Sequence, residues 1–223
     1  MSPPPAASAS AASSPAEAKP SKPSKAGAPA AAEPAGHGAG NEAAGLAALR
    51  ERKLEFDEPS YYRALSEGDG EAVRAYLDAG MSANHVFADE NKRTPLMVLF
   101  FGRQVCASGA AGRKVVALLI QRGADVNAQD EKKNTALMFA ADSCDRETLR
   151  MLLKAGAKLN AKNWAGLTAL SMGIVTGNPG LEELIAAGAR LDPQIAKAYA
   201  DAYKGNPKAL ALVGWGLLLG MLA

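Results

Sequence analysis

The feature that most constrains the fold of this chain is a short pattern that recurs along it, a Leu-rich segment followed by glycine. The pattern occurs four times, and its glycines are Gly80, Gly123, Gly156 and Gly188, at spacings of 43, 33 and 32 residues. A second pattern, Thr then Pro or Ala then Leu, precedes the last three glycines and begins at Thr94, Thr135 and Thr168. A fixed period of this length is typical of repeat proteins, in which each unit is one supersecondary element. We therefore expect a stack of similar units.

Local chemistry makes each unit a pair of short helices. A Thr hydroxyl suits a helix start, where it can accept from a free backbone amide, and Pro95 suits the first helical position, where a missing N–H costs nothing. Each glycine suits the left-handed stop at the end of a helix. Two short helices cannot bury their apolar face alone, so neighbouring units must stack. We expect Leu119, Leu153 and Ile185 to lie in successive layers of one shared core.

The family pattern that these units resemble is the ankyrin repeat. The likeness is carried by residues 135–141 (TALMFAA), by Leu152 and Leu153, and by residues 123–128 (GADVNA), and it covers about residues 59–213. The resemblance implies an all-α solenoid of about five helix pairs, joined by short loops called fingers. In this family partners bind along the fingers and the first helix of each pair.

Two positions depart from the family pattern. The family's histidine is replaced by Met97, Met138 and Ser171, so its contact with the preceding Thr is lost. The glycine of the finger turn is replaced by Lys92 and Lys133, whereas the third finger keeps Gly166. A lysine held at positive φ costs on the order of 1 kcal/mol. These changes affect how tight the fingers are and leave the predicted fold unchanged.

Two units are irregular. The first is partial and is interpreted as the N-terminal cap, with Tyr61 and Leu65 on its first helix and Tyr76 on its second. In the second unit Thr94 to Gly123 is 29 residues, against 21 from Thr135 to Gly156, so 8 are extra. The insertion is expected within residues 102–112, with Phe100 and Phe101 in the core beside it. Pro207 is expected to open the second helix of the fifth unit.

The ends of the chain differ in composition from the repeats. Residues 1–45 contain no Leu, Ile, Val or aromatic residue, so they have nothing large to bury and are predicted to be a disordered Ala/Pro-rich tail. Residues 46–208 form the predicted repeat domain. Residues 209–223 form an apolar C-terminal helix without a charged residue. Three interpretations of Ala209–Ala223 stay open: a cap folded onto the domain, a surface for a partner or for self-association, and a membrane anchor, although fifteen residues span only roughly 22 Å as a helix.

Residue types that carry chemistry are sparse. The histidines are His37 and His85, and no Cys/His set has metal spacing. No Gly-rich phosphate loop or catalytic set can be assembled, so we predict no enzyme activity and no cofactor. Lys+Arg (25) and Asp+Glu (23) nearly cancel, which disfavours nucleic acid as a partner. The first residues lack the charged start and apolar run of a secretory signal, so a cytoplasmic location is expected.

The predicted function is a protein–protein interaction module or adaptor for an unidentified protein, with a membrane-associated scaffold as the alternative. The predicted partner-binding residues are Asp89, Glu90, Lys92, Arg93, Asp130, Glu131, Lys132, Lys133, Asn163 and Trp164. Trp164 is either an exposed interface anchor or folds onto the stem of Lys132 or Lys133. The Met stripe formed by Met97, Met138 and Met172 favours core filling over a binding surface.

Overall fold

The computed structural model describes residues 39–101, 109–143, 146–176, 178 and 180–202, and in this part of the chain every regular element is a helix. The predicted tail up to residue 38, most of the insertion, Pro207 and the run Ala209–Ala223 lie outside the described residues. The helices are α1 (Ala39–Glu51), α2 (Glu58–Glu67), α3 (Gly70–Asp78), α4 (Pro95–Phe101), α6 (Ala110–Gln121), α7 (Ala136–Ser143), α8 (Arg146–Lys154), α9 (Ala169–Thr176), α10 (Leu181–Ala186) and α11 (Pro193–Ala202).

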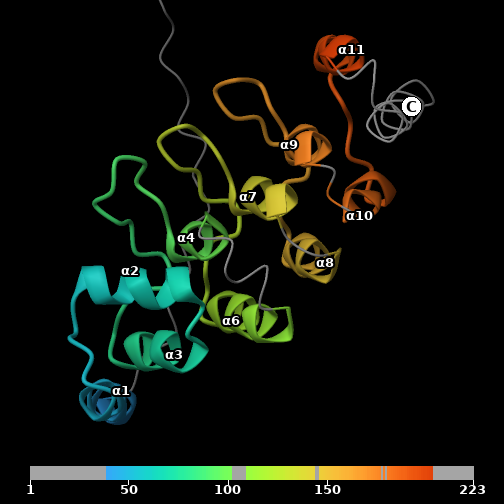
Figure 1. Cartoon of the computed structure of the whole chain (residues 1–223). Coiled ribbons are helices and arrows are strands. Elements are labelled where there is room, and N and C mark those ends of the chain that lie inside the picture. The colour runs from blue at the N-terminus through green and yellow to red at the C-terminus, as the bar shows by residue number, and fades with distance from the viewer. Residues whose placement is uncertain (1–38, 102–108, 144–145, 177, 179, 203–223) are drawn as a thin grey trace, which may run out of the picture. The chain divides into compact units, whose positions relative to one another are not determined.

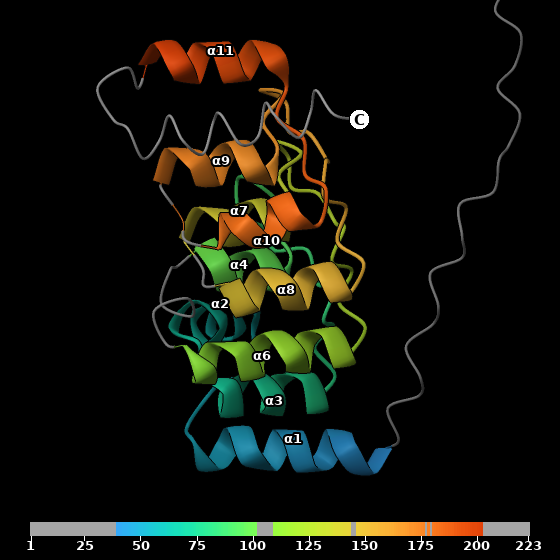
Figure 2. The same ribbon diagram turned by 90° about the vertical axis from the view of Figure 1, so that its right-hand side faces the viewer.

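The helices stack in two layers (Figures 1 and 2). The first helices of successive pairs, α2, α4, α7 and α9, contact one another in chain order, and α1, α3, α6, α8 and α10 do the same in the second layer. The loops between pairs project from the first-helix layer, on the side away from the second layer (Figure 1). This arrangement confirms the predicted all-α solenoid of stacked helix pairs with finger loops.

The recurring glycine ends each second helix in the same way. Gly80, Gly123, Gly156 and Gly188 have φ of 104°, 80°, 88° and 90°, where a side chain would be strained. The amide after each glycine donates to a carbonyl five residues back, and the four acceptors belong to Tyr76, Leu119, Leu152 and Leu184, at 2.9–3.0 Å. This hydrogen bond satisfies a carbonyl group that would otherwise lack a partner at the end of the helix.

The same four acceptor residues are the equivalent core positions of the repeat. Tyr76, Leu119, Leu152 and Leu184 are each fully buried. Leu153 and Ile185, which we expected to align with Leu119, are only half-buried because they lie one position further along the helix. The expectation of successive core layers is confirmed, but two of its three residues were wrong by one position.

Asparagine side chains bind each unit to the next. Asn84 donates from Nδ2 to the Gly123 carbonyl at 2.8 Å and accepts from the Asp125 amide at 2.6 Å. Asn127 repeats this arrangement with the Gly156 carbonyl at 3.0 Å and the Lys158 amide at 2.7 Å. These residues belong to the motif that ends each repeat, and their role is to satisfy backbone groups of the following unit.

The helix-start threonines behave differently from the prediction in two of three units. The amides of Met97 and Met138 donate to the carbonyls of Thr94 and Thr135, at 2.9 and 3.0 Å. Both hydroxyls are buried and find no hydrogen-bond partner among the residues that the structure describes. In the third unit the Ser171 amide donates to Thr168 Oγ1 at 3.3 Å, as predicted. Ser171 Oγ also accepts from the Thr168 amide and donates to the Thr168 carbonyl, both at 2.8 Å.

The N-terminal boundary lies earlier than predicted, because α1 begins at Ala39 and not at residue 46. Its Gly45 packs so closely on α3 that a Cβ there would lie 2.6 Å from the carbonyl carbon of Asp78. Leu49 is buried on the same helix. The first unit is a full helix pair, α2 and α3. Helix α1 covers α3 at the end of the second-helix layer.

Candidate partner-binding surface

Each finger tip is built by one Asp or Asn near its start. Asp89 Oδ1 accepts from the amides of Asn91 and Arg93 at 3.2 and 3.1 Å. Asp130 Oδ1 accepts from the amides two and four residues on at 2.9 and 2.7 Å, and Asn163 Oδ1 does so at 3.0 and 2.9 Å. These three residues, which we predicted to contact a partner, shape the turn that presents their neighbours.

The turns also hold the backbone conformation that the sequence predicted. Lys92, Lys133 and Gly166 occupy the equivalent position and have φ of 51°, 60° and 75°. Only glycine adopts this region without strain. Two of the three tips are therefore strained at a lysine.

Neighbouring fingers are joined through their backbones. The Glu131 amide donates to the Asn91 carbonyl at 2.8 Å, and the Trp164 amide donates to the Lys132 carbonyl at 3.1 Å. An ion pair between Lys92 Nζ and Glu131 Oε2 at 3.2 Å adds to the first junction. The three fingers thus form one connected row.

The structure divides the predicted site residues by exposure. Six side chains lie exposed on the row of fingers: Glu90, Lys92, Glu131, Lys132, Lys133 and Trp164. Asp89 and Asn163 are half-buried, and two of the predicted residues, Arg93 and Asp130, are buried. Arg93 pairs with Asp89 at 3.0 Å, and its guanidinium lies 3.7 Å above the ring centre of Phe101. Arg93 and Asp130 are therefore mostly buried within the fingers, and their predicted contact with a partner stays a prediction.

Trp164 is the most exposed large apolar side chain among the described residues, at 68%. In the part of the chain that the structure describes, no cation or ring stacks on its indole. At 68% exposure most of the indole surface is open to solvent. Its role in binding a partner stays a prediction.

A pocket that the sequence did not reveal lies on the first-helix layer. It has a volume of about 220 Å³ and is lined by Phe100, Phe101, Phe139, Asp142 and Met172. Phe101 is 51% exposed and meets Phe139 edge to face at 6.1 Å. We expected Phe101 in the core, and this was wrong: it is the last residue of α4, and its ring lies over Arg93 and against Phe139 at the surface.

Met97 and Met138 are buried and fill the core as predicted, whereas Met172 is half-buried and faces the pocket. The pocket draws on residues of three helices, α4, α7 and α9. The available sequence signal was that Phe139 and Met172 lie four residues after Thr135 and Thr168. That spacing marks an equivalent position on two first helices but does not show that a pocket opens beside it.

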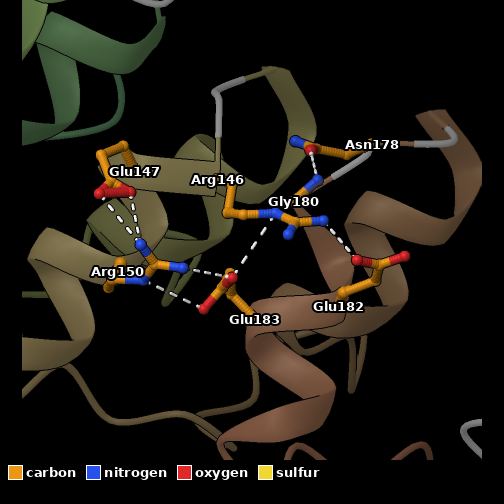
Figure 3. A network of polar contacts seen from close by, with 7 residues as sticks. All are labelled: Arg146, Glu147, Arg150, Asn178, Gly180, Glu182 and Glu183. Carbon is orange, nitrogen blue, oxygen red and sulfur yellow. Dashed lines mark hydrogen bonds and ion pairs between the residues drawn. The ribbon is translucent and has the colours of Figure 1, made fainter.

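A dense ionic network lies on the second-helix layer, between α8 and α10 (Figure 3). Glu183 accepts from Arg150 at 2.7 Å and lies 3.5 Å from Arg146, which also pairs with Glu182. The hydrogen bond to Glu183 and the nearby charge of Glu147 raise the pKa of Arg150. Arg146 and Arg150 of α8 pair with Glu182 and Glu183 of α10, so the network joins two units.

Comparison with known proteins supports this description. Residues 104–195 match a family model of ankyrin repeats in three copies. An ankyrin repeat-containing protein of Treponema pallidum (strain Nichols) is 33% identical over 128 residues, which is 57% of this chain and 40% of the relative. The transient receptor potential cation channel subfamily A member 1 of Drosophila melanogaster is 32% identical over 89 residues, 40% of this chain and 7% of the relative. This chain thus spans less than half of either relative's length. The stacked helix pairs, the repeated glycine stops and the row of fingers agree with this match, so this chain carries ankyrin repeats, which the family model places at residues 104–195.

Proposed function

We propose that this protein is a protein-interaction module that holds a partner protein on its fingers and first helices. Ankyrin repeats generally mediate protein–protein interaction, and this chain carries the surface that such a role needs. The observation that carries the proposal is the exposed apolar area on this side, where Trp164 is 68% exposed and Phe101 51% exposed. Exposed aromatic side chains at a rigid surface are frequent binding anchors.

The two apolar features favour different contacts. Trp164 projects from a finger whose backbone is bonded to the preceding finger, so little further ordering is needed when a partner packs on the indole. The pocket beside Phe101 and Phe139 has room for one apolar side chain of a partner. Together they would fix both the position and the register of a bound segment.

The test is affinity capture of partners from the source organism with matched variants. Trp164→Ala should weaken capture by about 1 kcal/mol or more without lowering the melting temperature, because the indole makes little contact within the chain. Lys154→Ala changes an exposed residue at the end of α8 in the second-helix layer and should leave capture unchanged. Equal capture by Trp164→Ala and the unchanged protein would remove the finger surface from the proposal.

None of the described helices is long and apolar enough to cross a bilayer. The alternative of a membrane-associated scaffold, and that of self-association, rest on Ala209–Ala223, which lies outside the described residues. The cytoplasmic location also stays a prediction.

A further inference from the structure

The charges along the finger row are unevenly paired. Lys92 pairs with Glu131 at 3.2 Å, and Lys162 pairs with Asp192 at 3.0 Å. Lys132 and Lys133 are exposed, and within the described ranges neither side chain has an ion pair or hydrogen bond. The second finger therefore presents two cations that the rest of the described chain does not neutralise.

The backbone at Lys133 adds an independent observation. Lys133 has φ of 60°, and the equivalent residue of the third finger is Gly166. Lys92 has the same strain, but its ammonium group contacts the neighbouring finger through Glu131. Lys133 carries the strain with no such contact among the residues described. Backbone strain of this kind concentrates at functional sites, and here it holds a positive charge at the tip.

The exposed indole projects from the finger next to the one that carries the two lysines. The Trp164 amide donates to the Lys132 carbonyl at 3.1 Å, which places the third finger directly against the second. We name the three residues Lys132, Lys133 and Trp164 the Lys–Trp patch. An apolar face flanked by two unpaired cations complements a segment that carries carboxylates next to an apolar side chain.

Resting on the proposed function, we infer that the Lys–Trp patch selects an acidic segment of a partner protein. Carboxylates of the segment bind Lys132 and Lys133, and an adjacent apolar residue packs on Trp164. A protein segment fits better than a nucleic acid or an anionic membrane, because the exposed carboxylate of Glu90 lies on the same row. This anion repels a uniform polyanion, whereas a protein can place its charges singly.

The test is selection of a displayed library of short random peptides on the full chain. The selected peptides should be rich in Asp and Glu next to an apolar residue, and a selected peptide made synthetically should lose affinity as NaCl rises from about 0.05 to about 0.5 M. The double change Lys132→Glu, Lys133→Glu should lower the affinity for that peptide about tenfold or more. Lys154→Glu, at the end of α8, is the control for an altered charge on the second-helix layer and should leave the affinity for the peptide almost unchanged.

A second variant separates binding from folding. Lys133→Gly removes the charge and relieves the positive-φ strain. It should therefore raise the melting temperature and lower the affinity for the acidic peptide. A lower melting temperature would contradict the strain argument and with it the inference.

The outcomes distinguish the two proposals. Peptides that depend on Trp164 but show no acidic preference would overturn the inference and leave the proposed function standing. Failure to select any peptide that depends on the fingers would count against both. Binding of single-stranded DNA or phosphatidylserine vesicles that is lost in the double variant, without acidic peptides, would also overturn the inference.

Discussion

Replacing Thr by Val at two equivalent helix starts should change stability in opposite directions. Thr135 and Thr168 are both 3% exposed, so the substitution changes the same group in the same degree of burial. Thr135 Oγ1 has no hydrogen-bond partner, and an unsatisfied buried hydroxyl costs about 1–3 kcal/mol. Because Val has nearly the shape of Thr, Thr135→Val should leave stability unchanged or raise it by about 1 kcal/mol.

Thr168→Val should instead destabilise the array. It removes the oxygen that accepts from the Ser171 amide at 3.3 Å, in the buried first turn of α9. One lost hydrogen bond costs about 1 kcal/mol. The unfolding free energies of the two variants should therefore differ by about 1–2 kcal/mol.

Urea unfolding monitored by circular dichroism measures the difference, and hydrogen exchange of the Met138 and Ser171 amides locates it. Exchange is needed because repeat arrays can lose two-state behaviour, which would blur a single unfolding free energy. Thr94→Val is a second control and should resemble Thr135→Val, since its hydroxyl is also unpaired. Equal losses at all three positions would refute the reasoning.

Three further predictions follow from contacts between units. Asn127→Ala removes two hydrogen bonds to the next unit, so it should cost about 1–2 kcal/mol and speed exchange of the Lys158 amide; unchanged exchange would contradict the bridging role. Glu183→Gln should lower the melting temperature more than Glu182→Gln, because the Glu183 side chain is 19% exposed and contacts two arginines, whereas that of Glu182 is 71% exposed. The difference between the melting temperatures of the two variants should narrow in high salt. The Ala88 amide lowers the pKa of Glu58 from its ordinary 4.5, so the stability this carboxylate contributes is present above pH 4.5 and lost as pH falls through the lowered pKa. Melting curves of Glu58→Gln should show a smaller loss between pH 5 and pH 3 than the unchanged protein.

Several features could be predicted because they depend on local chemistry that repeats. The positive φ of Lys92 and Lys133 follows from their place in a turn where the third finger has glycine. The left-handed helix stops follow from the glycines themselves. In each case neighbouring residues in the sequence decide the backbone conformation. Because the pattern recurs in several units, it is not an accidental match.

Other features failed prediction because another group competed for the same hydrogen bond or held the same side chain. The hydroxyls of Thr94 and Thr135 did not cap their helices because the target amides bond to the threonine carbonyls. Arg93 was expected on the surface, but Asp89 and the Phe101 ring hold it in place. Charge and position in a loop do not reveal such partners.

The repeat, the stacked helix pairs and the places where the fingers turn follow from the sequence alone, because short-range capping and a regular apolar spacing favour stacked helix pairs. Which finger charges stay free and where the aromatic pocket opens depend on how the units pack in three dimensions. The pocket combines side chains of α4, α7 and α9, and the pairing of Lys92 with Glu131 joins two fingers. Such contacts depend on the distance between units after stacking, which no local pattern encodes.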